Sequence, residues 1–230
     1  ADIRIAWGGH DAVESILSLP KNVFTEDIIY GPKYSYVIID EESIKKDKKV
    51  ISQKIALDVS TFDQYACSSP HTVFVKTKDQ ELISEFSLSL AQAMEDVERI
   101  MLPKAKETEE KSKEIISTRS EYEIKGKVIS SKNLDWTVIV SNDEGFAKPT
   151  FSRVIHVRPF TESNMILKDS RKIQSIGISV DDEERFDLID KITFLGGDRC
   201  PSLGKMSFFD SPWDGMFGMD RMVRWITTYK

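Results

Sequence analysis

Short apolar runs alternate with segments of helical periodicity along the chain, and this alternation restricts the fold more than any other feature. Strands are predicted at 3–7, 34–40, 72–76, 135–140, 153–158, 173–179 and 192–195, and helices at 11–18, 49–65, 79–101, 104–124, 181–190 and 219–229. Strands and helices that alternate in this way build a largely parallel sheet with helices on both faces. The sequence therefore predicts an α/β protein, a three-layer αβα sandwich.

Length and charge narrow the classes of function. A chain of 230 residues can bury one large core. Its net charge of −6 argues against general binding to nucleic acid or anionic lipid. Its longest apolar runs have about five residues, whereas a membrane helix needs about 20. With no leader-like opening segment, we expect a cytoplasmic protein without a membrane span.

The two cysteines are the main candidates for chemistry. Cys67 and Cys200 form no Cys-x-x-Cys pair and have no histidines at metal spacing, so a zinc site is not expected. Both are read as thiols because the cytoplasm is reducing. The helix predicted over 49–65 has an apolar stripe and is expected to end at Cys67. The Ser-Ser-Pro turn that follows suits a partly exposed side chain with backbone N–H groups near an oxyanion.

Several stretches resemble one enzyme family in the same order along the chain. They are IAWGGHDAV (5–13), IIYGPKYS (28–35), DQYAC (63–67), FSRVIHV (151–157) and DGMFGMDRMVRWI (214–226). Together they resemble the C-terminal half of the bacterial long-chain fatty acyl-CoA reductases, the reductase component of the bioluminescence fatty acid reductase complex. That family belongs to the aldehyde dehydrogenase superfamily, which implies an aldehyde-dehydrogenase-like catalytic domain.

The resemblance implies a thioester mechanism. Cys67 would accept the acyl group of a long-chain acyl thioester, and hydride from NADPH would release it as a fatty aldehyde. Trp7, Gly8 and Gly9 would contact the cofactor, most of whose site is expected in an N-terminal half that precedes this chain. If GPK matches the Gly-Gly-Lys segment of hydrolytic relatives, Ile29 stands where they carry a glutamate base, so the acyl-thioester would be protected from water.

The resemblance also suggests a division of the chain. Residues 1–24 would end the dinucleotide-binding domain, and 25–165 would form the thiol-bearing catalytic domain. Residues 166–230 would complete that domain and return toward the cofactor. The implied partners are an acyl-CoA or acyl-protein donor and an acyl-protein synthetase, with a homo-oligomer also expected.

Other polar residues are weaker candidates, each with a structural interpretation beside the functional one. His71 is a base near the thiol or a residue of a strand entrance, and His156 is read as structural. Lys33 and Arg153 contact phosphate, orient the site or form ion pairs. The Gly196-Gly197 segment is read as a turn because it lacks the spacing of a phosphate loop.

Two alternatives to a reductase remain open at this stage. An acyl-transfer module would use Cys67 without a nicotinamide and would be acylated without reduction. A catalytic-domain fragment without activity of its own would show an inert thiol and a large exposed apolar face. Acyl chain length, the physiological acyl donor and a role in bioluminescence are not encoded in any pattern of the sequence.

Overall fold

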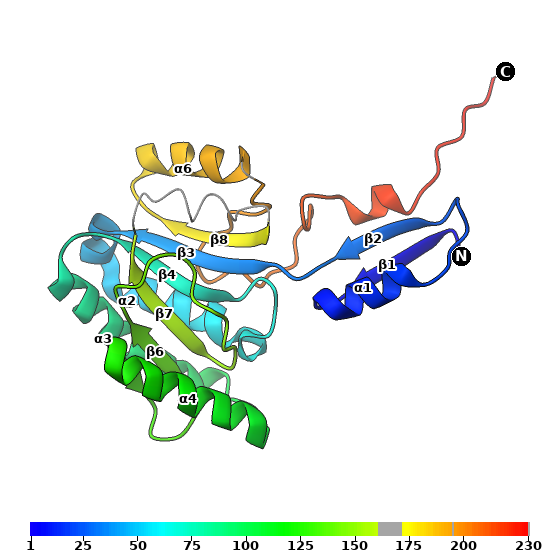
Figure 1. The fold of residues 1–230 in the computed structure, drawn as a ribbon. Helices are drawn as coiled ribbons and strands as arrows, with labels where there is room; N and C mark the ends of the chain where they lie inside the picture. The colour runs from blue at the N-terminus through cyan, green and yellow to red at the C-terminus, as the bar shows by residue number, and fades with distance from the viewer. Residues whose placement is uncertain (161–171, 195, 230) are drawn as a thin grey trace. The chain divides into compact units, whose positions relative to one another are not determined.

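The computed structural model describes residues 1–160, 172–194 and 196–229, and these form two compact units. The smaller unit comprises Ala1–Lys33 and Phe209–Lys230, and the larger unit is Tyr34–Phe208 (Figure 1). The two units are separate bodies of contacts, so each has its own packing. No helix in the described ranges combines the length and apolar character that a membrane crossing requires.

A six-stranded sheet lies at the centre of the larger unit. Its order is β5 (Lys127–Ser130), β6 (Thr137–Val140), β7 (Val154–Pro159), β4 (Pro70–Lys76), β3 (Tyr34–Asp40) and β8 (Ile173–Ser179). All neighbouring strands pair in parallel except β5 and β6, which are antiparallel. The prediction of a largely parallel α/β sheet is confirmed.

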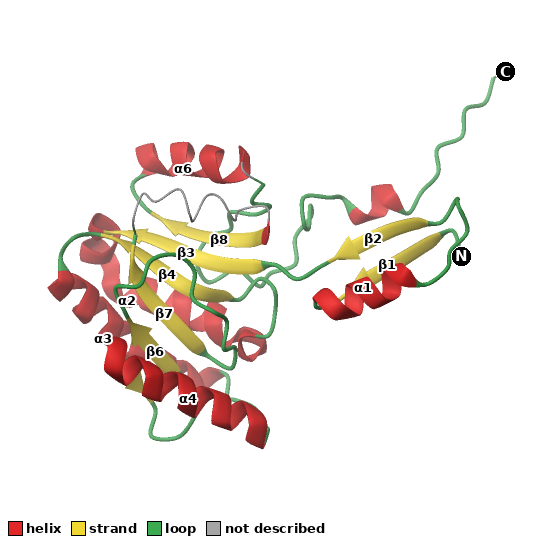
Figure 2. Cartoon of the chain, viewed as in Figure 1, coloured by secondary structure: helices red, strands yellow, loops and turns green. Residues whose placement is uncertain are grey.

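Helices cover both faces of this sheet, as Figure 2 shows. They are α2 (Glu41–Ser60), α3 (Gln80–Asp96, continued by a wider helical turn over Val97–Met101), α4 (Glu109–Lys125) and α6 (Asp182–Phe194). Side chains such as Ile55 and Phe86, from α2 and α3, share one core with Val73 and Ile155. On the other face α6 packs on β3 and β8, and α4 packs through Ile115. Neighbouring strand residues point to opposite cores, as the two-residue period of a strand requires.

The smaller unit is a β-α-β turn. β1 (Ile3–Trp7) and β2 (Glu26–Tyr30) are parallel, and α1 (His10–Ser18) connects them. Arg4 binds Asp27 across the two strands at 2.8 Å. This hydrogen bond and that of a neighbouring lysine lower the pKa of the Asp27 carboxyl to about 2. An ion pair therefore links the two strands.

Two secondary-structure predictions need correction, and two strands were not predicted. The strand expected at 192–195 is the end of α6, because Ile192 is buried on the sheet as a helix residue one turn after the partly buried Leu188. The helix expected at 219–229 is only a short turn over Gly218–Arg221. An amphipathic segment becomes helical when its apolar face packs, and Trp225 is 88% exposed in the described structure. Strand β2, of five residues, and strand β5, of four residues, were not predicted.

Candidate active site

Cys67 lies in the loop between α2 and β4, at the amino-terminal ends of the parallel strands. It is half-buried and not in a disulfide. The Ser35 hydroxyl, at the start of β3, donates a hydrogen bond to the Cys67 carbonyl at 2.7 Å. The Ser35 hydroxyl oxygen in turn accepts a hydrogen bond from the Ser175 N–H of β8 at 3.1 Å. The backbone of the thiol residue is thus tied to two adjacent strands.

A left-handed turn, rather than the expected helix end, leads to this cysteine. Helix α2 stops at Ser60, and Phe62, Asp63 and Gln64 adopt φ values of 55°, 49° and 67°. Three consecutive residues without glycine in this region carry a conformational cost that surrounding contacts must offset. The prediction that the helix itself ends at the thiol is therefore wrong, and the turn over residues 62–64 sets the direction in which the chain reaches Cys67.

Gln64 supplies many of those contacts. Its side chain is fully buried, and Nε2 donates to the Pro70 carbonyl at 2.8 Å and to the Val154 carbonyl at 3.0 Å. Its Oε1 accepts from the Val154 N–H at 2.8 Å. A buried amide with its partners in place adds specificity to a backbone path, because leaving these groups unpaired would be costly.

Aromatic rings pack beside the thiol loop. The rings of Tyr65 and Phe151 stack with centroids 5.6 Å apart and an interplanar angle of 3°. His71 meets the Phe151 ring edge-on at 5.1 Å and the Tyr34 ring at 5.3 Å. Burial lowers the pKa of His71 to about 4, so its imidazole is neutral near pH 7. The structure supports a packing role for His71.

Cys200 occupies a different environment. It is packed against the core that contains Tyr36, Ile176 and Ile192. Burial raises the pKa of its thiol to about 11, so almost none is thiolate at neutral pH. A thiol in that state is a poor nucleophile. The structure therefore separates the two cysteines, which the sequence alone does not.

The residues proposed to contact a cofactor lie in the smaller unit. Trp7 ends β1 and is 57% exposed, and Gly8 and Gly9 form the turn into α1. A side chain at Gly8 would come within 3.3 Å of Ala12 Cβ, whereas a Cβ at Gly9 would meet nothing within 4 Å. No side chain caps the N-terminus of α1. The turn is thus open to close approach by a ligand at the carboxyl end of a parallel strand.

Ile29 lies beside this turn in the same unit. It is half-buried on β2 and pairs in register with Ala6 of β1, one residue before Trp7. An aliphatic side chain cannot accept a proton, so this position provides no base. Cys67 belongs to the larger unit and the cofactor candidates belong to the smaller one.

The remaining candidates have structural roles in the described ranges. Lys33 lies 3.8 Å from the Asp214 carboxylate, and Arg153 is buried in ion pairs. His156 is buried on β7, as its structural interpretation predicted. A Cβ at Gly197 would come within 2.7 Å of Ile192, so this glycine serves packing. No group of three or more potential metal ligands is found in the part of the chain that the structure describes.

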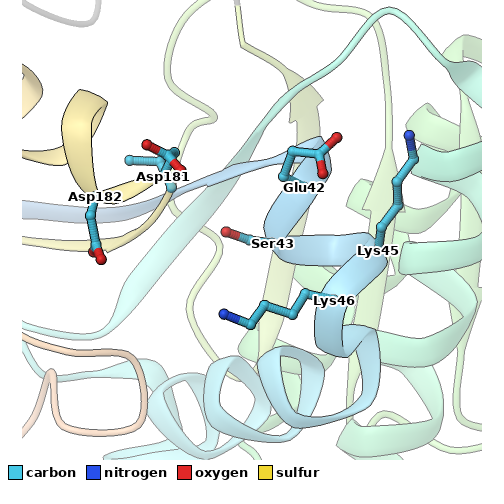
Figure 3. A pocket seen from close by; sticks show the side chains of 7 residues that line it. Glu42, Ser43, Lys45, Lys46, Asp181 and Asp182 are labelled. Atoms are coloured by element: carbon cyan, nitrogen blue, oxygen red, sulfur yellow. The ribbon is translucent and has the colours of Figure 1, made fainter.

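A charged pocket of about 490 Å³, which was not predicted from the sequence, lies at the carboxyl ends of strands β3 and β8 (Figure 3). It is lined by Glu42, Ser43, Lys45, Lys46, Val180, Asp181 and Asp182, where α2 and α6 begin. The Asp40 carboxylate accepts hydrogen bonds from the N–H groups of Ser43 and Asp181 at 2.8 and 2.9 Å. Asp40 thus takes N–H groups that an anion would otherwise bind. This pocket and the thiol lie at opposite ends of β3.

Comparison with known proteins decides the family. The family model described as acyl-CoA reductase (LuxC) matches residues 1–225. The chain belongs to this family. Among curated members, the long-chain acyl-protein thioester reductases of Vibrio harveyi and Photorhabdus luminescens are 26% and 27% identical over 232 residues. These matches cover 98% and 99% of the chain but 46% of each relative, so the chain spans about half of their length.

Solved structures identify the fold of this acyl-CoA reductase family member. An NADP-dependent glyceraldehyde-3-phosphate dehydrogenase from Bacillus halodurans matches with a TM-score of 0.63 and 17% identity, over 86% of this chain and 44% of its own. A gamma-glutamyl-gamma-aminobutyraldehyde dehydrogenase from Burkholderia cenocepacia also matches at 0.63, with 13% identity, over 86% and 43%. The expected aldehyde-dehydrogenase-like fold is confirmed.

The sequence did not reveal the roles of the residues that precede Cys67. From the sequence, Asp63 and Gln64 were recognised only as part of the DQYAC motif, and no structural role was predicted for them. Both hold the left-handed turn through long-range contacts. Their respective partners, Arg153 and Val154, each lie 90 residues further along the chain. The one available signal was the presence of two polar residues three and four positions before the candidate thiol, at the end of a segment predicted to be an amphipathic helix.

Proposed function

We propose that the protein reduces a long-chain fatty acyl thioester to the fatty aldehyde, with Cys67 as the residue that carries the acyl group. The observation that carries this proposal is the half-buried Cys67, fixed on its loop by Ser35 in an acyl-CoA reductase family member. The matched relatives are named long-chain acyl-protein thioester reductases, which supports the substrate class. The high pKa of Cys200 supports the choice between the two thiols.

The first half of the proposed reaction is acyl transfer. The Cys67 thiolate attacks the acyl carbonyl carbon, a new carbon–sulfur bond forms and the donor thiolate leaves with the electron pair of the broken bond. The hydrogen bond from Ser35 to the Cys67 carbonyl fixes the backbone that carries the sulfur. Fixing the nucleophile in this way lowers the entropic part of the barrier.

The second half is reduction. NADPH, when bound, supplies hydride to the acyl carbon. Cleavage of the carbon–sulfur bond then releases the aldehyde and returns the electron pair to the Cys67 sulfur. The acyl-enzyme has to survive until this step, and the aliphatic Ile29 in the smaller unit provides no base to activate water.

The turn at residues 7–9 suits a nicotinamide cofactor. The open face of Gly9 permits close backbone approach, and the uncapped start of α1 leaves N–H groups available to polar ligand atoms. We propose that Trp7, Gly8 and Gly9 contact NADPH. One structural neighbour was solved in complex with NADP, which supports the nicotinamide class.

The acyl donor and the assembly are also proposed from the family. The relatives' names favour an acylated protein as donor, and long-chain acyl-CoA offers the same thioester carbon. We propose an acyl-protein synthetase as the partner that supplies the acyl group and a homo-oligomer as the assembly. The division at residues 24 and 165 into cofactor-domain end, catalytic domain and returning segment stays a prediction, as does a cytoplasmic location.

The first experiment measures the intact mass of the protein after incubation with palmitoyl-CoA at neutral pH. One added acyl group is expected, labile to hydroxylamine, present in Cys200→Ser and absent in Cys67→Ser. Addition of NADPH should then release hexadecanal and restore the original mass. Acylation without aldehyde would favour the acyl-transfer module, and acylation lost only in Cys200→Ser would overturn the assignment of Cys67.

A further inference from the structure

A buried arginine connects the thiol loop to two other parts of the larger unit. The Arg153 side chain is 2% exposed. Its Nε donates to the Asp63 carboxylate at 2.7 Å, and its Nη1 donates to Glu98 at 2.6 Å. Asp63 lies four residues before Cys67, and Glu98 lies in the helical turn that continues α3. The guanidinium therefore bridges the approach to the thiol and the helix layer.

Backbone N–H groups also bind Asp63. The Ser152 N–H donates to the Asp63 carbonyl at 3.0 Å, and the Ala105 N–H donates to the Asp63 carboxylate at 3.3 Å. Asp63 is thus held through its main chain and its side chain from two distant segments. A residue held at both ends cannot move without breaking several bonds, one of which involves a buried charge.

Two left-handed turns meet at this point. Residues 151–153 have φ values of 59°, 58° and 61°, similar to those of the turn at residues 62–64. Arg153 ends one turn and its side chain binds the middle residue of the other. Backbone in this region persists only where surrounding contacts fix it. The arginine is the charged contact that both turns share.

We propose that Arg153 is a positioning residue for Cys67: its bridge to Asp63 and Glu98 holds the left-handed turn that places the thiol for acyl transfer. The proposal rests on the proposed function of Cys67. Phosphate binding, an earlier interpretation of Arg153, does not fit, because the side chain is buried and its donors face two carboxylates. The planar guanidinium can address both partners at once, whereas a lysine ammonium is a single point charge.

Arg158 offers a matched control on β7, the strand that begins directly after Arg153. It is also buried, at 4% exposure, and Nη1 donates to the Gly145 carbonyl at 2.9 Å while Nη2 faces Asp143 at 3.3 Å. These hydrogen-bond partners lie outside the thiol loop. Replacing either arginine by methionine removes one buried charge from β7 or its entrance, but only Arg153→Met removes the contact with Asp63.

The first test is amide hydrogen exchange of the protein and its variants, which requires no substrate. Arg153→Met is expected to lose protection at Ser152 and Val154 and across the thiol loop, at least tenfold in exchange rate. Arg158→Met should leave these amides protected. Equal protection of the loop in wild type and Arg153→Met would overturn the proposal, whatever the catalytic function proves to be. If Arg153→Met does not fold, Glu98→Gln and Arg153→Lys provide milder losses of the same bridge.

The second test separates thiol position from thiol presence. Acylation of Cys67 by palmitoyl-CoA should fall at least tenfold in Arg153→Met, because this step depends on alignment. Alkylation by iodoacetamide, which needs only an accessible thiolate, should change less than about threefold. Arg153→Lys should recover part of the acylation rate, and Arg158→Met should retain it.

The outcomes distinguish the two proposals. Acylation absent from the wild type, with loop protection lost in Arg153→Met, would reject the proposed function and keep the structural bridge. Acylation at the wild-type rate in a folded Arg153→Met variant would reject the positioning role and keep the proposed function. An equal loss of acylation in Arg158→Met would show a general effect of buried charge and would also reject the positioning role.

Discussion

Gln64 and Val154 are joined by a reciprocal pair of hydrogen bonds, although 90 residues separate them. The Gln64 amide donates to the Val154 carbonyl at 3.0 Å, and the Val154 N–H donates back to the amide oxygen at 2.8 Å. The Gln64 side chain therefore pairs with both backbone groups of Val154, as a residue of a neighbouring strand would do at the start of β7. It completes the sheet's hydrogen bonding where the left-handed turn interrupts regular structure.

Replacing Gln64 by leucine tests the strength of this pair. The change leaves a buried N–H and two buried carbonyls without these partners, so the free energy of unfolding should fall by about 2–4 kcal/mol. Urea denaturation measures this difference. Gln92→Leu is the control, because Gln92 is exposed on α3, and it should change stability by less than about 0.5 kcal/mol. A similar small effect at Gln64 would contradict the proposed importance of the pair.

The two thiols should differ in reactivity. Since burial raises the pKa of Cys200 to about 11, only about one molecule in a thousand carries that thiolate at pH 8. Limited iodoacetamide treatment of the folded protein should therefore label Cys67 at least tenfold faster than Cys200, as measured by peptide mass spectrometry. In urea both should react at similar rates. Comparable labelling of Cys200 in the folded protein would show that its environment is more open than the structure indicates.

The sequence predicts the layers of this fold better than it predicts the site. Apolar runs such as that of β3 are buried on both faces, so their composition alone marks them as central strands. The strand β5 was missed because it is the outer strand of the sheet and none of its residues is fully buried, so it lacks a marked apolar run. Family resemblance, rather than periodicity, singled out Cys67.

Backbone handedness around the thiol could not be predicted. Phe62 belongs to the apolar stripe of the helix predicted over 49–65, yet it has a positive φ and is 59% exposed. The next two residues of the turn, Asp63 and Gln64, are bound by Arg153 and Val154, which lie far away in sequence. Local patterns contain no information on such partners, so tertiary contacts override the helical preference.

Asp58 should give the protein a component of stability that declines as pH rises. It is 2% exposed, and burial raises its pKa to about 7 although it accepts hydrogen bonds from the N–H groups of Gly204 and Met206. Between about pH 4 and 7 the folded state keeps a proton that the unfolded chain has released. The contribution of Asp58 to the unfolding free energy therefore falls as pH rises through this window.

Comparison with Asp58→Asn isolates this contribution. The stability of the wild type relative to this variant should fall by roughly 1–3 kcal/mol between pH 5 and pH 8, measured by urea denaturation at both values. Asp187→Asn, on the exposed side of α6, is the control for removing a carboxylate. A constant difference between wild type and Asp58→Asn across this range would mean that the carboxyl ionises as in the unfolded chain.

His156 should have the opposite dependence on pH. Burial, with a smaller contribution from the positive charge of Arg158, lowers its pKa to about 3, so below pH 6.5 the unfolded chain binds a proton that the folded state does not. Stability linked to His156 is therefore present above pH 6.5 and is lost as pH falls. Neither ring nitrogen has a hydrogen-bond partner among the described residues, so the imidazole is also costly when neutral.

Replacing His156 by leucine should remove both costs. The variant should be more stable than wild type by about 1 kcal/mol at pH 7.5, and by about 2 kcal/mol more at pH 5, because the proton uptake of the unfolded histidine is lost. Urea denaturation at the two pH values measures both differences. His10→Leu, at an exposed site, is the control. If His156→Leu instead destabilised the protein at both pH values, the imidazole would have to be hydrogen-bonded in solution, and its burial would then be a source of stability.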